Sequence, residues 1–467
     1  MEKFDVVVIG GGPGGYPAAI RAAQLGARVA LVEKEQLGGT CLNWGCIPTK
    51  TLLAASDTLA HIKHAESLGI KVENARADYA AMVGRKNQVV EKLRGGIRQL
   101  LQGNGVTVYA GTGSFTGRNR IRVQQADATV EIEAGATILA TGSTSVMPGF
   151  IPKHARISES RAFLDRTSLP QSLIILGGGV IGCEFACMAA QLGVQVTIVE
   201  MLPDILAMLD ADIRKEVRRH LEQNLKVRVL TGQPMADIKA DDHQVSGTVG
   251  TETITAEHLL VSIGRRPVTD GLNLAAAGLA VDAKGFLEHD ACGRTKVATI
   301  YVIGDVSSGS TQLAHAATAQ GIAAAETIVQ GKRQAAETLI PACIFTSPEI
   351  GTVGLSEQAA QQAKQEVRIG RFHFAALGKA MAMGDTTGFV KWIVDPRTDR
   401  LLGAQAVGPH ATELIAEATV AVRAELTAVE LGRSVHCHPT LSEAWMEAAH
   451  AVHGTCIHGM PKRKPKA

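Results

Sequence analysis

The sequence predicts an α/β protein of several domains, and three observations lead to this fold class. The chain has 467 residues, enough for about three or four domains. A pattern of apolar run, glycine turn, small-residue helix and second apolar run occurs twice, around Gly10 and around Gly177. After about residue 345, alternating strands flank an amphipathic helix without a glycine fingerprint. We therefore expect two Rossmann-like domains followed by a C-terminal α+β domain.

The repeated pattern predicts two dinucleotide-binding units. Each copy has the spacing GxGxxG after an apolar run, and each ends its second apolar run in a glutamate. The glycines permit a tight turn, close approach of a pyrophosphate and close helix–strand packing, while the acid accepts a hydrogen bond from an adenosine ribose. The residues are Gly10, Gly12, Gly15 and Glu33 in the first copy, and Gly177, Gly179, Gly182 and Glu200 in the second.

Two such units in one chain can hold a flavin and a nicotinamide cofactor. Glu200 repels the 2′-phosphate of NADP, and the following "MLPDIL" offers no arginine in its place. The second unit is therefore predicted to bind NAD. The first unit leads directly into "GGTCLNWGCIPTK", so its cofactor is expected to lie beside Cys41 and Cys46.

These two cysteines allow three interpretations: metal ligands, a structural disulfide or a redox pair. A structural zinc site needs four ligands, and the nearest histidines in sequence, His61 and His64, are remote from the pair. Eight cysteines in a chain of this length are not a disulfide framework. We therefore favour a redox pair and predict no metal. Pro48 suits the first turn of a helix, where a nearby thiol ionises more easily.

The composition argues against several classes of protein. A net charge of +2 gives no electrostatic footprint for nucleic acid, and the basic end "PKRKPKA" is most simply solvated. No segment approaches the roughly 18 apolar residues of a membrane span. The start "MEKFDVVVIGGG" lacks the features of a signal peptide. We expect a cytoplasmic protein with neither a nucleic-acid nor a membrane partner.

Further segments extend the pattern along the chain. "ATILATGS" (136–143) and "TIYVIGDVSSG" (299–309) are strands followed by glycine turns, where ligands bind in such sheets. Asp305 either bonds sugar-like hydroxyls or forms the turn, and both interpretations stay open. Near the C-terminus, "FVKWIVD" and "RLLGAQAVG" predict antiparallel strands and "ATELIAEATVAVRA" an amphipathic helix. This last domain is expected to serve dimerisation.

Taken in order, these motifs resemble the pyridine nucleotide–disulfide oxidoreductases. The resemblance rests on the cysteine segment and on "ATG", "VSIGRRP", "IYVIGD", "QLAHAA", "FTSPEIGTVG" and "VHCHPTLSEAW". The last of these resembles in particular the members that act on dihydrolipoamide. The resemblance implies a homodimer that binds FAD and NAD and oxidises dihydrolipoamide to lipoamide with NAD⁺. It also implies partners: the lipoyl domains and acyltransferase core of a 2-oxoacid dehydrogenase complex, or the glycine cleavage carrier protein.

The resemblance implies separate roles for the catalytic side chains. Cys41 would be the outer thiol that meets the substrate, and Cys46 the inner thiol that contacts the flavin. His438, from the other subunit, would be the general base, since an imidazole titrates near pH 6.5. Glu443 would orient this base. The segment "TLSE" (residues 440–443) also fits a second interpretation, a capping box. In it Thr440 would be the N-cap of a helix, and the Glu443 side chain would accept the N–H of Thr440.

The resemblance also implies further cofactor contacts and domain boundaries. Lys50 is expected near the flavin and paired with Glu184, although both can also be surface charges. Domains are expected at 1–145 (FAD, first part), 146–273 (NAD), 274–343 (completing the FAD domain) and 344–467 (interface). The implied contacts are Lys50, Gly113, Thr141, Gly142, Asp305, Ala314 and His315 for FAD, and Glu184 and Gly264 for NAD.

Alternatives within the fold are a glutathione-like or mercuric-like reductase, and outside enzymology a docking flavoprotein. Glu200 argues against NADP-dependent glutathione reduction, and the C-terminus has no vicinal cysteine pair of the mercuric type. Gln320 stands where an acid is expected. His436 ranks below His438 as a base. A metal site in the tail is a minor alternative that involves His450, His453, Cys456 and His458.

Overall fold

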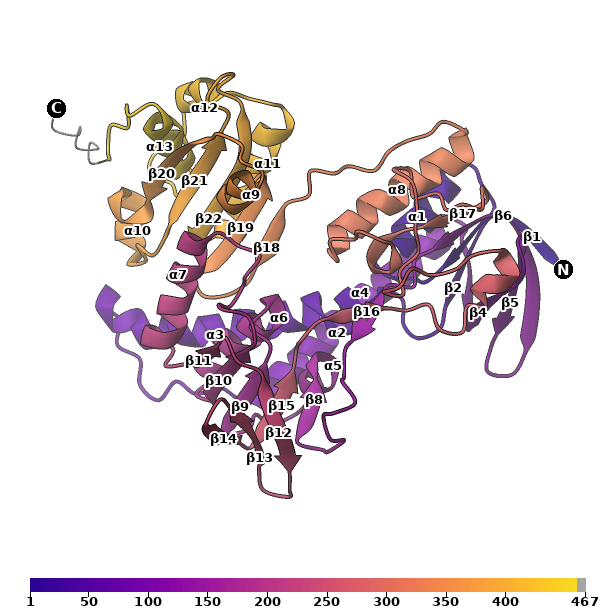
Figure 1. Cartoon of the computed structure of the whole chain (residues 1–467), viewed down its shortest axis with the longest axis horizontal. Helices are drawn as coiled ribbons and strands as arrows, with labels where there is room; N and C mark the ends of the chain where they lie inside the picture. The colour runs from indigo at the N-terminus through magenta and orange to yellow at the C-terminus, as the bar shows by residue number, and fades with distance from the viewer. Residues whose placement is uncertain (460–467) are drawn as a thin grey trace.

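The computed structural model describes residues 1–459, which form three bodies, each built on one main sheet (Figure 1). The first body holds a seven-stranded sheet in the order β3-β2-β1-β6-β5-β4, with β17 beside β6. Its strands are β1 (Glu2–Ile9), β2 (Val29–Glu33), β3 (Thr107–Ala110), β4 (Thr112–Gly117), β5 (Arg120–Gln124), β6 (Thr129–Leu139) and β17 (Ile300–Val302). Its helices are α1 (Gly15–Gln24), α2 (Gly39–Trp44), α3 (Cys46–His64), α4 (Tyr79–Gly103) and α8 (Ala314–Gln330).

The second body repeats the parallel arrangement with a five-stranded sheet in the order β11-β10-β9-β15-β8. A three-stranded antiparallel sheet, β12-β13-β14, and the pair β7–β16 accompany it. The strands are β7 (Ser143–Ser145), β8 (Ile157–Glu159), β9 (Ser172–Leu176), β10 (Gln195–Glu200), β11 (Arg228–Thr231), β12 (Met235–Ala240), β13 (Val245–Val249), β14 (Glu252–Ala256), β15 (His258–Val261) and β16 (Arg265–Pro267). The helices are α5 (Ser160–Leu164), α6 (Val180–Gln191) and α7 (Ala211–Arg219).

The third body, at the upper left of Figure 1, is an antiparallel sheet in the order β18-β19-β22-β21-β20 with helices packed against it. An extended segment after α8 leads into it. Its strands are β18 (Ala342–Ile344), β19 (Glu349–Gly354), β20 (Arg368–His373), β21 (Phe389–Val394) and β22 (Leu401–Gly408). Its helices are α9 (Glu357–Gln362), α10 (Gly378–Met383), α11 (Ala411–Arg423), α12 (Ala428–Arg433) and α13 (Glu443–Val452).

The expected repeat is present in the structure. β1–α1–β2 and β9–α6–β10 are both strand–turn–helix–strand units, and within each unit the two strands pair in parallel. The central strands are apolar and buried on both faces, as parallel sheets covered by helices require. The predicted C-terminal pair, β21 and β22, is antiparallel and α11 lies where the helix was expected.

The start of α3 agrees with the sequence pattern. The helix after the first cysteine, α3, begins at Cys46, so Pro48 lies in its first turn as the sequence suggests. The helix includes this proline because a first-turn N–H needs no intrahelical acceptor. The four domain boundaries stay predictions. The basic end 461–467 lies outside the described residues.

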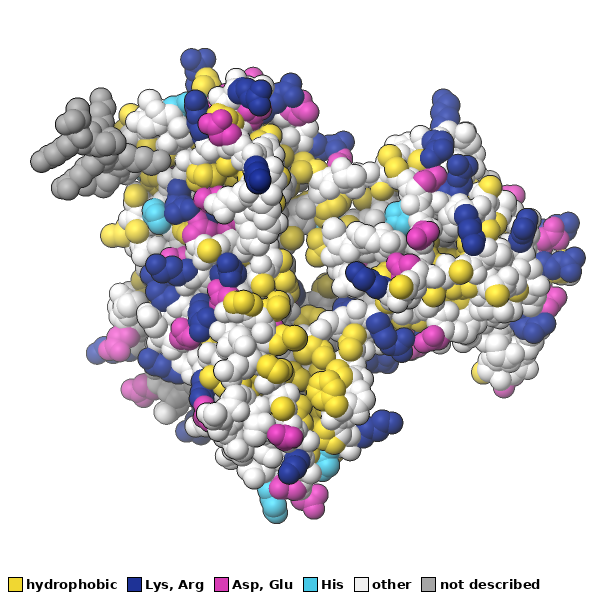
Figure 2. Space-filling model, viewed as in Figure 1, with side chains coloured by type: hydrophobic (Ala, Val, Ile, Leu, Met, Phe, Trp, Pro, Cys, Tyr) yellow, Lys and Arg dark blue, Asp and Glu magenta, His cyan; other side chains and the backbone are white. Residues whose placement is uncertain are grey.

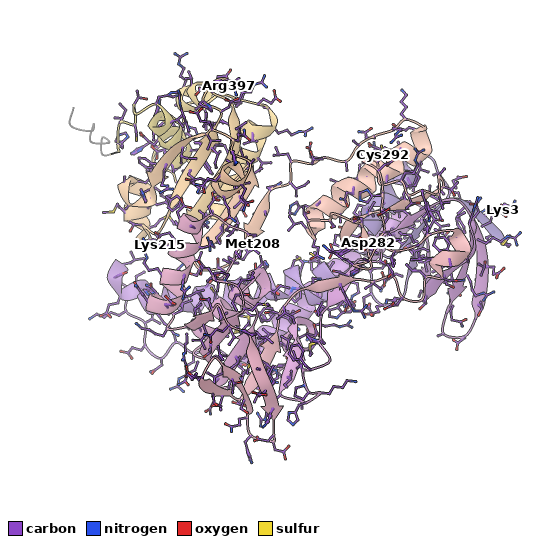
Figure 3. The ribbon with its side chains drawn as sticks, in the orientation of Figure 1. Lys3, Met208, Lys215, Asp282, Cys292 and Arg397 are labelled. Carbon is purple, nitrogen blue, oxygen red and sulfur yellow. The ribbon has the colours of Figure 1, made fainter. Side chains whose placement is uncertain are left out.

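The bodies are joined by buried ion pairs as well as by apolar packing. The side chain of Lys391 on β21 is fully buried, and its Nζ lies 2.7 Å from Asp210 and 2.9 Å from Asp212 at the start of α7. Glu357 of α9 completes the network at 3.2 Å. Figure 3 labels Met208 and Lys215, on either side of these aspartates, where α7 approaches the third body.

The surface matches the modest net charge. On the face in Figure 2, basic and acidic side chains are interspersed, and neither sign forms a continuous field. Within residues 1–459 the structure holds no helix long and apolar enough to cross a membrane.

Candidate active site

The first and third glycines of each motif are required by the protein's own backbone. Gly10 has φ of +106°, and a Cβ there would lie 2.3 Å from the carbonyl oxygen of Ala140. A Cβ on Gly15 would lie 1.8 Å from the oxygen of Gly10. The second copy repeats this: the corresponding distances are 2.5 Å for Gly177, from Ser262, and 1.9 Å for Gly182, from Gly177. The third glycine lets each helix pack closely against the end of its strand, and the first lets the turn pack against the residue that follows the neighbouring strand, β6 or β15.

The second glycine of each motif, in contrast, borders open space. A Cβ on Gly179 would meet no atom within 4 Å, and one on Gly12 would meet only Gly39, at 3.8 Å. The protein therefore does not itself need a glycine at either position. A pyrophosphate that approaches the helix N-terminus closely does need one, so both turns fit a dinucleotide.

The glutamates that end the two units are held in the same way. Glu33 Oε2 accepts the N–H of Gly11 at 2.7 Å, and Glu200 Oε2 accepts that of Gly178 at 2.7 Å. In each case the other oxygen accepts the N–H two residues further on. A carboxylate has about four acceptor positions, so each retains capacity for a ribose hydroxyl.

The cysteine pair lies beside the first glycine turn. Gly39, which begins α2, has φ of +58°, and a Cβ there would lie 2.7 Å from the Cα of Gly12. Cys41 lies on α2, and Cys46 is the first residue of α3. Both cysteines are free, Cys41 partly buried and Cys46 exposed. The chain thus folds the pair against the turn that fits the first cofactor.

The two thiols differ in acidity. The hydrogen bond that Cys41 donates lowers the pKa of Cys46 to about 7, and the charge of Lys50 adds to this effect against the opposing effect of burial. Donating that hydrogen bond raises the pKa of Cys41, and burial raises it further. Cys46 is therefore the thiol that ionises near neutral pH, which makes it the better leaving group of the two.

Lys50 is paired with Glu184 as expected. Its Nζ lies 2.8 Å from Oε1 and 2.7 Å from Oε2 of Glu184, whose side chain is 5% exposed. The N–H of Phe345 donates to the same carboxylate at 2.9 Å, and the Lys50 ammonium lies 4.6 Å from the centre of the Phe345 ring. One carboxylate therefore joins α3, α6 and the segment after β18.

Several other expected contact residues surround the carboxyl end of the first sheet. Ser143 Oγ donates to Asp305 at 2.6 Å, and Arg265 donates to Ser143. Thr141 Oγ1 donates to the carbonyl of Val268 at 2.6 Å. The other expected contact residues have these places in the fold: Gly113 is on β4, Gly142 precedes β7, Gly264 precedes β16, and Ala314 and His315 begin α8.

Gln320, the departure from the expected acid, keeps an acceptor role. Its Oε1 accepts the N–H of Gly304 at 2.7 Å, just before Asp305. A neutral carbonyl oxygen can accept this bond as a carboxylate would, so the local turn is retained without the negative charge.

His438 is held by Glu443. Its Nδ1 lies 2.9 Å from Glu443 Oε1, while the imidazole is 77% exposed. Burial opposes ionisation of Glu443, but hydrogen bonds from the Thr440 N–H and from His438 lower its pKa. Because Nδ1–H donates to the carboxylate, Nε2 keeps a free lone pair in the neutral ring.

The capping-box interpretation of "TLSE" is half right. Glu443 Oε2 accepts the Thr440 N–H at 2.8 Å, as the capping box requires. However, Thr440 Oγ1 donates to the carbonyl of Cys437, and the N-cap of α13 is Ser442. The alternatives do not compete, because the two oxygens of one carboxylate serve the backbone and the imidazole at once.

Within one chain the site is in two parts. In Figure 1, α13 lies in the third body, well separated from α2. No hydrogen bond or ion pair among residues 1–459 joins His438 to Cys41 or Cys46.

The sequence assigned no role to Phe345, although this residue begins the motif "FTSPEIGTVG", and it missed Glu417 altogether. Glu417 Oε1 lies 2.6 Å from Nε2 of His436, so the histidine ranked lower in the sequence has its own carboxylate. Neither contact has a local signal, since the partners are distant in the chain.

The tail histidines are bound to carboxylates. His458 and Cys456 both contact the buried Glu447, and His453 contacts Asp399. Over residues 1–459 no group of three or more His, Cys, Asp or Glu side chains is arranged to hold a metal.

Comparison with known families agrees with this site. The family model described as pyridine nucleotide-disulphide oxidoreductase matches residues 4–321, and the dimerisation domain of the same family matches 340–449. The chain belongs to the pyridine nucleotide-disulphide oxidoreductases. It carries their dimerisation domain, and it is an FAD-containing, NAD-dependent oxidoreductase, in agreement with the two dinucleotide turns.

Individual relatives and solved structures are similar to this chain over nearly its whole length. The dihydrolipoyl dehydrogenase of Chlamydia trachomatis is 43% identical over 99% of this chain and 100% of its own length. That of Halobacterium salinarum is 42% identical over 97% of each chain. Among solved structures, LpdA from Mycobacterium tuberculosis has a TM-score of 0.89 at 30% identity, covering 96% of this chain and 99% of its own. The Cu(II) complex of the HOCl-induced flavoprotein disulfide reductase RclA from Escherichia coli has a TM-score of 0.87 at 29% identity, covering 96% and 99%.

The second and third glycines of the second motif, Gly179 and Gly182, should respond differently to alanine. Gly179→Ala should leave the melting temperature unchanged, because its Cβ meets nothing, but raise the KM for NAD roughly tenfold, or about 1.4 kcal/mol of binding. Gly182→Ala should destabilise the fold by about 1–3 kcal/mol, because its Cβ meets the Gly177 oxygen. Thermal unfolding measures the stability of each variant, and the kinetics of NADH oxidation by a dye measure its KM for the nicotinamide cofactor. An unchanged KM in Gly179→Ala would contradict the assignment of this turn.

Lys50 should control the acidity of Cys46. In Lys50→Met the pKa of Cys46 should rise, on the order of one pH unit or more, because a nearby positive charge is lost. Mass spectrometry can follow the alkylation of Cys46 by iodoacetamide in the reduced enzyme. The rate of this alkylation should therefore begin to rise at a higher pH in Lys50→Met than in wild type. Lys63→Met, on the same helix, is the control. An inflection that stays near pH 7 in Lys50→Met would refute this account.

Proposed function

We propose that the protein oxidises the dithiol of dihydrolipoyl groups to the disulfide, with NAD⁺ as final acceptor. The observation that carries this proposal is the place of the two free cysteines beside the first dinucleotide turn: Cys41 lies on α2, whose first residue Gly39 packs against Gly12, and Cys46 begins α3. The names of the relatives, dihydrolipoyl dehydrogenases over the whole chain length, support the choice of substrate.

Proton removal is assigned to His438. Nδ1–H is held by Glu443, so Nε2 takes the proton of a substrate thiol, and the carboxylate stabilises the imidazolium that forms. The high exposure of the imidazole leaves Nε2 accessible to a substrate carried on a flexible arm.

Thiol exchange is assigned to the cysteine pair in its oxidised state. The substrate thiolate attacks Cys41 Sγ, the Cys41–Cys46 bond breaks, and Cys46 leaves as a thiolate. The second substrate thiol then attacks the substrate sulfur of the mixed disulfide, and the bond from that sulfur to Cys41 breaks. Cys41 leaves as a thiol by taking the proton that the base received from the first substrate thiol, and the base takes the proton of the second. The substrate is now a disulfide and the protein pair holds two electrons. Bound FAD supplies the carrier that moves this electron pair to NAD⁺.

Lys50 and Glu184 support this exchange. The ammonium lies one helical turn after Cys46 and stabilises its thiolate, and Glu184 fixes the ammonium. Cys46 therefore departs as an anion at neutral pH.

The two parts of the site are proposed to meet in the homodimer. His438 and Glu443 of one subunit act on the cysteine pair of the other, because within one chain α13, which begins at Glu443, lies apart from α2, which carries Cys41 (Figure 1). The dimerisation domain that carries them supports this arrangement.

The cofactor assignments follow the two turns. FAD is placed at the first unit and NAD at the second, with the domain boundaries 1–145, 146–273, 274–343 and 344–467. Asp305 and the first residues of α8 are assigned to FAD with the glycine turn, and Glu200 to the ribose of NAD.

The macromolecular partners are proposed from the same substrate. A lipoyl group reaches an enzyme on a lipoyl domain of a 2-oxoacid dehydrogenase complex, with its acyltransferase core, or on the glycine cleavage carrier protein. A cytoplasmic location is proposed because the cysteine pair must be able to cycle in a reducing compartment.

Cys46→Ser should abolish oxidation of dihydrolipoamide while FAD stays bound, because the exchange loses its leaving thiolate. NAD⁺ reduction and the flavin absorbance of the purified protein measure the two properties. Cys437→Ser, which changes an exposed cysteine outside the pair, should retain activity. Full activity in Cys46→Ser would refute the assignment, and reduction of oxidised glutathione by wild type would favour the related glutathione reductase instead.

His438→Gln should lower dihydrolipoamide oxidation by about 10²–10⁴-fold, because no general base remains. Oxidation of NADH by an artificial dye bypasses the thiol step and should survive. His243→Gln, at an exposed histidine of the second body, is the matched control. An equal loss of both activities would indicate that His438 serves folding.

A further inference from the structure

The sequence "HCH" contains two histidines with opposite surroundings. The side chain of His438 is 77% exposed, whereas that of His436 is 8% exposed. Both ring nitrogens of His436 face acceptors: Nδ1 lies 2.9 Å from the carbonyl oxygen of Ser434, and Nε2 lies 2.6 Å from Oε1 of Glu417 on α11. A backbone carbonyl has no proton to give.

Only one distribution of protons satisfies both contacts without strain. A neutral imidazole donates from one nitrogen alone and would present a lone pair to one of the two oxygens. The second proton must therefore lie between Nε2 and Glu417, and it resides on the ring because imidazole is about two pH units more basic than a carboxylate. The short contact fits such a charge-assisted bond.

The surrounding charges favour the same state. The hydrogen bond to Glu417 raises the pKa of His436, burial opposes the rise, and Glu443 at the start of α13 adds to it. Glu417 and Glu443 are the charged groups that act on this ring from the helices packed against it. Both side chains are acidic, so their negative charges offset the positive charge of a protonated His436.

The segment that carries His438 depends on this contact. Residues 434–439, which follow α12, are largely exposed and form no helix or strand, and Val435 is 97% exposed. The segment is held at His436 by Glu417, and at Thr440 by Glu443. The base lies between these two anchors.

We propose that His436, held as an imidazolium by Glu417, is a positioning residue that fixes the segment carrying His438 so that Glu443 can orient the base. This rests on the proposed function, in which His438 acts on a substrate thiol. His436 itself touches neither substrate nor cofactor.

The proposal predicts a pH dependence with a definite sign. A histidine with a raised pKa in the folded protein stabilises its contacts at low pH, and this stabilisation is lost as pH rises through the folded pKa. Dihydrolipoamide oxidation should therefore fall on the alkaline side relative to NADH-dye oxidation, which does not use His438.

Glu417→Gln tests whether the contact between Glu417 and His436 holds the segment that carries His438. The neutral amide no longer favours the imidazolium, so dihydrolipoamide oxidation should fall by up to about 10²-fold through misplacement of the base. NADH-dye oxidation should be retained, and the alkaline fall should begin at lower pH. Glu413→Gln, one turn away on α11, makes the same chemical change without a hydrogen bond to the segment and should match wild type.

His436→Gln should lower the same activity but remove the pH dependence that comes from this titration. Equal loss of both activities in Glu417→Gln and His436→Gln would overturn the positioning role in favour of a structural one. Activities and pH profiles equal to those of Glu413→Gln would overturn it as well.

The protonation state can be measured without any activity. In ¹⁵N-histidine NMR of the FAD-loaded protein, one pH unit above the ordinary histidine pKa of about 6.5, one ring should carry protons on both nitrogens. This signal should be absent in His436→Gln. A neutral His436 under these conditions would overturn the proposal. Wild-type enzyme that shows the imidazolium but fails to oxidise dihydrolipoamide would refute the proposed function alone.

Discussion

The ion pair between Lys50 and Glu184 is the contact on which the rest of the site depends. Glu184 is almost fully buried, accepts both contacts of the ammonium and also the N–H of Phe345, and so joins segments from all three bodies. Removing one member of a buried pair typically costs about 3–5 kcal/mol, because the other charge is left without a partner. The same ammonium lies one turn from Cys46 and helps to lower its pKa. The interaction that joins the domains therefore also contributes to the acidity of the thiol, since the Lys50 charge lowers the pKa of Cys46 and the Glu184 charge opposes this effect.

A buried ion pair carries a large desolvation cost, and apolar packing around it offsets that cost. One core cluster contains Leu52 and Leu53 of α3, Phe185 of α6, and Ile350 and Phe389 of the third body. The helix that begins with Cys46 is thus packed against both the second sheet and the interface domain. The Cys46 thiol therefore lies at the start of a helix whose side chains pack into a core, while the base lies on an exposed segment. This difference suits a reaction in which one group stays against a bound cofactor and the other meets a mobile substrate.

The sequence predicted those parts of the structure that rest on local pattern. Both Rossmann-like units were found because GxGxxG, strand periodicity and the terminal Glu33 or Glu200 are short-range features, and the C-terminal strands alternate clearly. It failed where one side chain has two roles or where a partner is distant. Thr440 is not the N-cap, because its hydroxyl donates to the carbonyl of Cys437. The pairing of His436 with Glu417 depends on how α11 packs against the loop, which no local pattern encodes.

The same kind of contact occurs beside the proposed thiolate and at the proposed general base. A largely buried carboxylate fixes a nitrogen group: Glu184 fixes the Lys50 ammonium, and Glu443 fixes the His438 imidazole. The Lys50 ammonium and the His438 imidazole have different roles because they face different numbers of acceptor oxygens. Two carboxylate oxygens hold the ammonium as a fixed charge beside a thiolate, whereas His438 has an acceptor at Nδ1 alone and keeps Nε2 free for proton transfer. His436, with acceptors at both nitrogens, cannot act as a base in this arrangement. Counting acceptors around each ring therefore separates the proton-transferring histidine from its neighbour two residues away.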